Sequence, residues 1–251
     1  MTKTILIKIL SLISSIFAIF VNFLAVALPL NNRSTGAISD SFNAALIPAS
    51  YVFSIWGLIY LGLISFPVYQ IFLRKDEDFS KVNIYFILSN LANALWIVLW
   101  HYGHYTWCLL VMLILLGTLI ASYVKLEIGK KQVDTLQMIM VHGVFSLYLG
   151  WITVATVANA QATLIARGFD GFGIAPEIWA TLLIAIIAAL TFVFIKYRKD
   201  IIYTFVILWS LFGVFVRMDS NLVAYSALST FITIALFLGY NVYKNNITKA
   251  K

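Results

Sequence analysis

Long apolar runs dominate this sequence and leave few folds open to it. Spanning the roughly 30 Å hydrocarbon core of a bilayer takes about 20 residues of helix. Eight segments qualify, at about 5–30, 50–73, 82–101, 105–125, 136–160, 176–196, 201–218 and 222–243. Hydrophobic residues make up 62% of the 251 residues and charged residues only 11%. In a soluble domain about a quarter of the residues are charged. The sequence therefore predicts an all-α, polytopic transmembrane bundle of about eight helices.

The lysines and arginines test this division independently, because cytoplasmic loops are enriched in them. If the N-terminus lies inside and each segment crosses once, 14 of the 17 basic residues fall on the inner side. Only Arg33, Arg167 and Arg217 fall outside. A miscounted helix would move every later loop to the other side. We therefore expect N- and C-termini in the cytoplasm, and attribute the net charge of +7 to topology rather than to nucleic acid.

The first segment also has features of a signal peptide, since Lys3 and Lys8 precede an apolar run that reaches Ala25-Val26-Ala27. The run from Ile5 to Leu30 is longer than the roughly 7–15 residues of a signal-peptide core, so we expect a retained membrane helix. Frequent Ile, Lys and Asn favour a bacterial plasma membrane.

Three segments carry aromatic and amide side chains at helical spacing. Each residue of a helix turns about 100°, so residues three or four apart share a face. Lipid offers these polar groups no hydrogen-bond partner, so they must meet another helix or a cavity. They are Phe53, Trp56 and Tyr60 in the second segment, Asn90, Asn93, Trp96 and Trp100 in the third, and Tyr148, Trp151 and Asn159 in the fifth.

Two interpretations of these faces remain open from spacing alone. In the first, amides and small residues hold the helices together, at about 1 kcal/mol or less per contact. In the second, indole and phenol rings line a shared cavity for a flat apolar molecule, because each ring offers a rigid stacking surface and one donor.

The same three segments resemble a known family. The stretch YLGWITVATVAN, from Tyr148 to Asn159, is similar to the fifth-helix pattern Y-x-x-W-x-x-x-A-x-x-x-N of the translocator proteins, or tryptophan-rich sensory proteins (TspO/MBR). NALWIVLWH, from Asn93 to His101, resembles the third-helix motif, and PASYVFSIWGLIY, ending at Tyr60, resembles the second. The chain departs from the family at Leu147, where a proline is usual, and in residues 160–168, which lack the sterol motif.

This resemblance implies a five-helix membrane domain over residues 1–165, whose cavity takes hydrophobic ligands such as porphyrins. Residues 166–251 would then be a three-helix C-terminal extension, which makes the chain a long form. The ligand-binding residues expected from the motifs and faces are Trp56, Tyr60, Asn93, Trp96, Trp100, Tyr148, Trp151 and Asn159.

The charged and histidine residues argue against several other functions. Every Asp and Glu lies in a loop or near a helix end, which disfavours ion coupling by a carboxylate at mid-membrane. We expect no metal at His101 and His104, and assign them to the interfacial aromatic belt. Arg33 and Arg167 are hypothesised to pair with a ligand carboxylate at the outer mouth of the aromatic cavity.

We therefore expect a binding or sensory protein for a flat hydrophobic ligand, with a tetrapyrrole as the leading class and no required cofactor. The alternative is a facilitative transporter of a small apolar or amphipathic solute, and a purely structural scaffold is the third reading. No nucleophile–base pair, phosphate loop or metal quartet is present, so we expect no enzyme activity beyond porphyrin photochemistry. The expected partners are the bilayer and the ligand, and a homodimer is compatible with the sequence.

Overall fold

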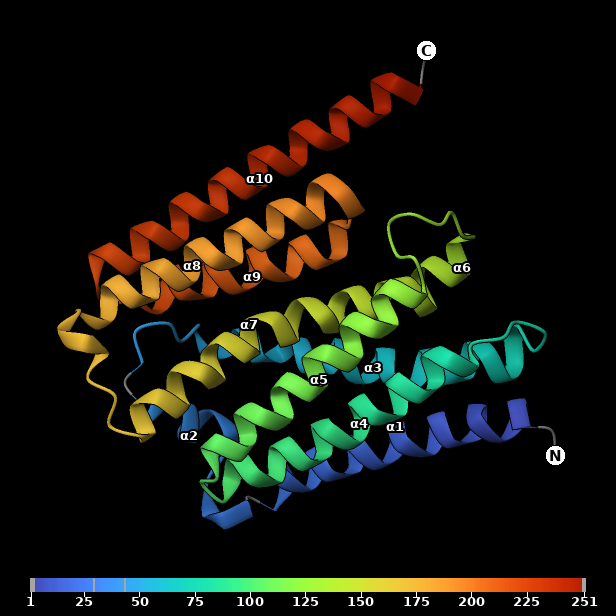
Figure 1. The fold of residues 1–251 in the computed structure, drawn as a ribbon, viewed down its shortest axis with the longest axis horizontal. Helices are drawn as coiled ribbons and strands as arrows, with labels where there is room; N and C mark the ends of the chain where they lie inside the picture. The colour runs from blue at the N-terminus through green and yellow to red at the C-terminus, as the bar shows by residue number, and fades with distance from the viewer. Residues whose placement is uncertain (1–2, 29, 43, 250–251) are drawn as a thin grey trace.

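In a computed structural model, which describes residues 3–28, 30–42 and 44–249, the chain is an all-helical bundle (Figure 1). No strand occurs in these residues, which confirms the predicted fold class. The α-helices are α1 (Lys3–Ala27), α2 (Thr35–Asp40), α3 (Ile55–Val68), α4 (Ser80–His101), α5 (Tyr105–Lys125), α6 (Thr135–Gln137), α7 (Gly143–Ala166), α8 (Pro176–Val193), α9 (Ile201–Arg217) and α10 (Asn221–Lys249).

Shorter helical pieces extend several of these helices. The 3-10 helix η2 (Ser50–Ser54) leads into α3, and π-helices continue α3 as η3 (Tyr69–Leu73) and α8 as η6 (Phe194–Arg198). A third π-helix, η4 (Met138–His142), joins α6 to α7. Isolated 3-10 turns η1 (Leu30–Asn32) and η5 (Gly171–Gly173) lie in the connections.

The described residues contain seven helices long and apolar enough to cross a bilayer, and α9 is the shorter eighth segment. At 17 residues, α9 is about 26 Å long, near the lower limit for spanning the hydrocarbon. It lies alongside α8 and α10 (Figure 1). The chain is thus an integral, multi-pass membrane protein, and α1 begins at the end of the bundle where α10 finishes (Figure 1), as eight crossings require.

Helix α7 connects the two parts of the bundle. On one side it packs against α5, which packs in turn against α4 and so reaches α1. On the other side it packs against α9, which contacts α10, and α10 also contacts α8. The α7 span is the most enclosed one in the described bundle, with 67% of its most apolar window buried.

Helix α1 supplies hydrogen-bond partners to the asparagines of α4. The Ser11 hydroxyl donates to Asn83 Oδ1 at 2.6 Å, and Asn22 Nδ2 donates to Asn93 Oδ1 at 2.7 Å. Between these bonds, Asn90 Nδ2 donates to the hydroxyl of Ser14 at 3.0 Å. These groups are buried where water cannot replace a lost partner, so they fix the register of α1 against α4.

Helix α9 is held at both ends by polar contacts with earlier helices. At its N-terminus the buried Asp200 carboxylate accepts hydrogen bonds from the Tyr123 hydroxyl at 2.8 Å and the Ser146 hydroxyl at 2.6 Å. At its C-terminus, Arg217 forms an ion pair with Asp40 at 2.7 Å. Asp200 lies at a helix end, as the sequence predicts, but it is only 6% exposed.

We predict that Asn83→Leu destabilises the bundle. Its amide is paired with Gln70 in both directions at 2.8 Å and accepts from Ser11, so leucine would leave these buried groups without partners. The expected loss in unfolding free energy is about 1–3 kcal/mol. Denaturant titration in detergent, followed by circular dichroism, measures it.

The matched control is Asn241→Leu, because the Asn241 amide bonds to Phe237 of its own helix. This variant should unfold close to the wild type. Equal stability of both variants would contradict the structural role assigned to Asn83.

Candidate ligand-binding site

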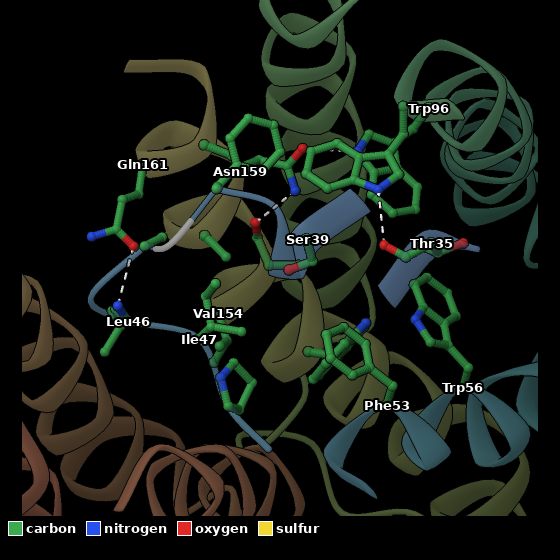
Figure 2. Close-up of a pocket in the computed structure, with 18 residues that line it drawn as sticks. Thr35, Ser39, Leu46, Ile47, Phe53, Trp56, Trp96, Val154, Asn159 and Gln161 are labelled. Atoms are coloured by element: carbon green, nitrogen blue, oxygen red, sulfur yellow. Dashed lines mark hydrogen bonds between the residues drawn. The ribbon is translucent and has the colours of Figure 1, made fainter. Parts of the chain in front are cut away.

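A pocket lies near one end of the bundle, between α3, α4 and α7, with the segment from α2 to Pro48 as its outer wall (Figure 2). Its cavity volume is about 60 Å³, so the walls lie close together and leave only a narrow slot. Its walls are formed by Thr35, Ser39, Phe42, Ala44, Leu46, Ile47, Pro48, Phe53, Trp56, Trp96, Trp100, Trp151, Val154, Ala155, Ala158, Asn159, Gln161 and Ala162.

Stacked aromatic rings from α3 and α4 form one side of the site. Trp56 stacks on Trp96, with ring centroids 6.5 Å apart and planes 19° apart. Trp96 stacks in turn on Trp100 at 5.8 Å and 26°, while Tyr60 stacks on Trp56 at 5.6 Å. These four rings form an aromatic ladder whose indoles line the pocket.

Trp151 meets the ladder edge-on, and Phe53 meets Trp151 in the same way. Trp151 of α7 lies 6.1 Å from Trp56 with the ring planes at 81°, and Phe53 lies 5.8 Å from Trp151 at 82°. Edge-to-face packing fixes these rings through their quadrupoles. The site is therefore built from rigid aromatic surfaces set at two orientations.

Most polar groups of the pocket are already paired within the protein. Trp96 Nε1 donates to Asn159 Oδ1 at 2.9 Å, which ties α4 to α7, and Asn159 Nδ2 donates to the Ala155 carbonyl at 3.0 Å (Figure 2). Trp100 Nε1 donates to the Thr35 carbonyl at 3.3 Å. The same residues thus connect helices and line the cavity, so the two interpretations of the polar faces are compatible.

Three buried polar atoms in this region have no hydrogen-bond partner among the described residues. They are Trp151 Nε1, Tyr148 Oη and Asn93 Nδ2. Trp151 lines the pocket, and its side chain is almost fully enclosed, so a ligand acceptor in the slot could meet its indole N–H. Tyr148 contacts the Trp56 ring edge-on at 6.2 Å but does not line the pocket.

The structure places five of the eight expected site residues in the wall of this pocket: Trp56, Trp96, Trp100, Trp151 and Asn159. The other three, Tyr60, Asn93 and Tyr148, do not line it. Tyr60 and Tyr148 instead pack against Trp56, and Asn93 bonds to Asn22 of α1.

The wall formed by Thr35 to Pro48 was not expected from the sequence, because the segment has no helical periodicity and reads as a connection. It closes on the pocket through contacts such as the Leu46 N–H, which donates to Gln161 Oε1 of α7 at 3.3 Å (Figure 2). Phe42 also packs edge-on against Tyr105 at 4.8 Å. In the sequence, only the many apolar residues of this wall segment could have indicated that it is buried.

The outer polar residues adopt positions that the sequence did not predict. His101 is buried rather than interfacial: its Nδ1 pairs with the Ile97 carbonyl at 2.8 Å, and its backbone carbonyl accepts from Asn31 at 3.1 Å. Arg33 and Arg167 do not line the pocket; Arg167 Nε donates to Thr106 Oγ1 at 3.0 Å. Within the described chain no group of three or more potential metal ligands occurs.

Helix α9 fixes the segment between the outer wall and α3. Trp209 Nε1 donates to the Val52 carbonyl at 3.2 Å, and the Ala49 N–H donates to the Gly213 carbonyl at 3.0 Å. Arg217 Nη1 donates to the Pro48 carbonyl at 3.4 Å. Since the three α9 residues are spaced four apart, they form one face of α9 against the edge of the pocket.

Comparison with known families agrees with the arrangement of these motifs. A sequence profile described as TSPO-like protein matches residues 8–240, almost the whole chain. The chain belongs to the TSPO-like protein family. The match includes the region beyond residue 165, so the TSPO-like assignment covers all eight helical segments. No curated protein and no solved structure matches the chain.

We predict that Gly213→Ala disturbs the wall of this TSPO-like pocket. A Cβ at this position would overlap the Val52 side chain and lie 3.2 Å from Pro48 Cβ. Val52 is fully buried and β-branched, so it has little freedom to move. The overpacking should lower the unfolding free energy by about 1–3 kcal/mol in detergent.

Gly239→Ala of α10 is the matched control, because its Cβ would meet nothing within 4 Å. This change should be neutral or stabilising by up to about 1 kcal/mol, since alanine favours helix over glycine. If Gly213→Ala behaves in the same way, the close contact of α9 with the segment around Val52 is wrong.

Proposed function

We propose that this TSPO-like membrane protein binds or senses a flat hydrophobic ligand in the aromatic pocket, with tetrapyrroles as the ligand class. The observation that carries the proposal is the aromatic ladder facing a slot in which the Trp151 indole N–H has no partner within the described part of the chain. Large rigid rings with one donor each suit a planar ligand that carries an acceptor.

The aromatic walls of the pocket favour a planar rather than a globular ligand. Its cavity volume of about 60 Å³ is well below the range of about 300–1,000 Å³ found for small-molecule sites, so a ring ligand requires the walls to separate. A flat ring could enter edge-on and lie against the ladder formed by Trp56, Trp96 and Trp100. A bulky, rounded ligand would have to displace several buried indoles.

Entry of a ring as large as a porphyrin requires the outer wall to move. The hydrogen bonds that tie this wall to the helices include Leu46 to Gln161 and Trp100 to Thr35. Each of these two bonds contributes about 1 kcal/mol net, so neither by itself prevents the wall from opening. We expect the conformational change within residues 35–42 and 44–47, because Pro48, Ala49 and Val52 are held by α9.

The charge distribution supports an orientation for this pocket. With most lysines and arginines at the end where α1 begins and α10 ends, that end is assigned to the cytoplasm. The pocket lies toward the opposite end, between the α1–α3 connection and the final turns of α4 and α7. The ligand is therefore proposed to enter from the outer side of a bacterial plasma membrane or from its outer leaflet.

We predict that the purified protein binds protoporphyrin IX and that Trp151→Phe weakens binding about tenfold. Phenylalanine keeps an aromatic surface but removes the indole N–H, and a lost hydrogen bond of about 1.4 kcal/mol corresponds to a factor of ten. The porphyrin absorbance spectrum in detergent reports binding independently of tryptophan fluorescence.

Trp107→Phe is the matched control, because Trp107 is 62% exposed and lies outside the pocket. This variant should retain the wild-type dissociation constant. Absence of saturable binding to the wild type, or equal weakening in both variants, would refute the proposed site. Porphyrin flux across proteoliposomes that exceeds protein-free leakage would support the facilitative-transport alternative over sensing.

A further inference from the structure

Another cavity lies at the same end of the bundle as the aromatic pocket, in a groove between the turn from α4 to α5 and the end of α7 (Figure 1). Its volume is about 420 Å³, which is within the range of about 300–1,000 Å³ found for small-molecule sites. It shares no lining residue with the aromatic pocket. We call it the interfacial groove, and its walls are Gly103, His104, Tyr105, Thr106, Trp107, Leu110, Ala166 and Arg167.

Two hydrogen bonds fix the walls of this groove relative to each other. The Thr163 hydroxyl of α7 donates to the Tyr105 carbonyl of α5 at 3.0 Å. Arg167, which follows the last residue of α7, donates from Nε to Thr106 Oγ1 at 3.0 Å. Because both bonds join α7 to the first turn of α5, the groove is a fixed feature of their packing, and the Arg167 guanidinium is held in place at its edge.

The polar side of the groove carries donors and a positive charge. Apart from the bond to Thr106, the guanidinium of Arg167 has no hydrogen-bond or ion-pair partner among the residues that the structure describes. Thr106 keeps its own O–H for donation, and no Asp or Glu lines the groove. A guanidinium with free N–H groups pairs well with the oxygens of a phosphate or carboxylate. This side of the groove therefore suits an anion.

The other side of the groove is apolar and lies at the level where the helices leave the hydrocarbon. The side chain of Trp107 is 62% exposed, and that of Leu110, one turn further along α5, is 47% exposed. Since α5 begins at Tyr105 and α7 ends at Ala166, the groove lies at the ends of two membrane-crossing helices. Tryptophan is enriched at this level of a bilayer. A molecule that fills the groove must therefore place an anion next to a hydrocarbon chain.

We propose that the interfacial groove is a binding site for an anionic phospholipid, with its phosphate diester on Arg167 and Thr106 and an acyl chain along Leu110. A zwitterionic lipid carries the same phosphate. Its ammonium group, however, would find no carboxylate in the groove and would be repelled by the guanidinium. A headgroup with a net negative charge is therefore preferred. This site is separate from the aromatic pocket and does not depend on the ligand proposed there.

Photolabelling in phosphatidylcholine nanodiscs tests the proposal. Traces of phosphatidylglycerol or of phosphatidylcholine carry the same diazirine near the start of one acyl chain, and mass spectrometry identifies the labelled peptides. Residues 103–110 of the wild type should react about fivefold more with the phosphatidylglycerol probe, which corresponds to about 1 kcal/mol from one exposed charge contact. Inorganic phosphate should not lower this labelling more than chloride does at the same ionic strength, because a free anion has no acyl chain to hold it in the groove.

Arg167→Gln should reduce the preference for phosphatidylglycerol at residues 103–110 to about one, because glutamine is uncharged. Labelling beside the lysines at the opposite end of the bundle should keep its preference, which checks that the variant is folded. Arg33→Gln is the matched control, because Arg33 is also exposed but lies outside the groove. This variant should label as the wild type does.

Equal labelling of residues 103–110 by the two probes in the wild type would overturn the lipid site, and so would an equal loss in both arginine variants. Specific displacement by inorganic phosphate would identify a site for a soluble anion and would also overturn it. Porphyrin binding is measured at the aromatic pocket, so a failure of the lipid site leaves the proposed function standing, and the reverse also holds.

Discussion

The need to satisfy every polar group in hydrocarbon determines most of this structure. Water cannot pair with a buried amide or carboxylate inside the bilayer, so each such group requires another helix. Asn83, Asn90 and Asn93 of α4 find partners on α1 or η3, and the Asp200 carboxylate finds two hydroxyls on earlier helices. These contacts determine which helices are neighbours, and the apolar packing then fills the space between them.

The aromatic pocket follows from the same constraint applied to α4. The asparagine face of α4 packs against α1 and forms hydrogen bonds with it. The flanking indoles of Trp96 and Trp100 are therefore directed toward α3 and α7. Trp96 pairs with Asn159, and Trp100 pairs with the outer wall, while Trp151 keeps a buried N–H unpaired within the chain as described. An unpaired buried donor costs free energy, which makes the Trp151 indole the strongest indication of a ligand at this site.

Helix α9 links the C-terminal helices to the edge of the aromatic pocket. Through Trp209, Gly213 and Arg217 it holds the chain that leads from the outer wall into α3. It also contributes aliphatic side chains to a small second cavity that shares wall residues with the aromatic pocket. The geometry of the pocket therefore depends on helices that lie outside the three motif-bearing segments.

The sequence by itself determined where the eight long helical segments lie, because apolar length and basic loops report directly on the bilayer, although the fifth and eighth segments end about six residues later in the structure. It also determined which residues of the second, third and fifth segments carry polar faces, and so most of the aromatic wall. Only the tertiary structure decided which neighbour each face meets: helical periodicity gives a direction around one helix, but the partner in that direction depends on how all the helices pack. For this reason the sequence did not show that Asn93 bonds to α1 or that His101 is buried. Nor did it show that a connection without periodicity forms the outer wall of the pocket.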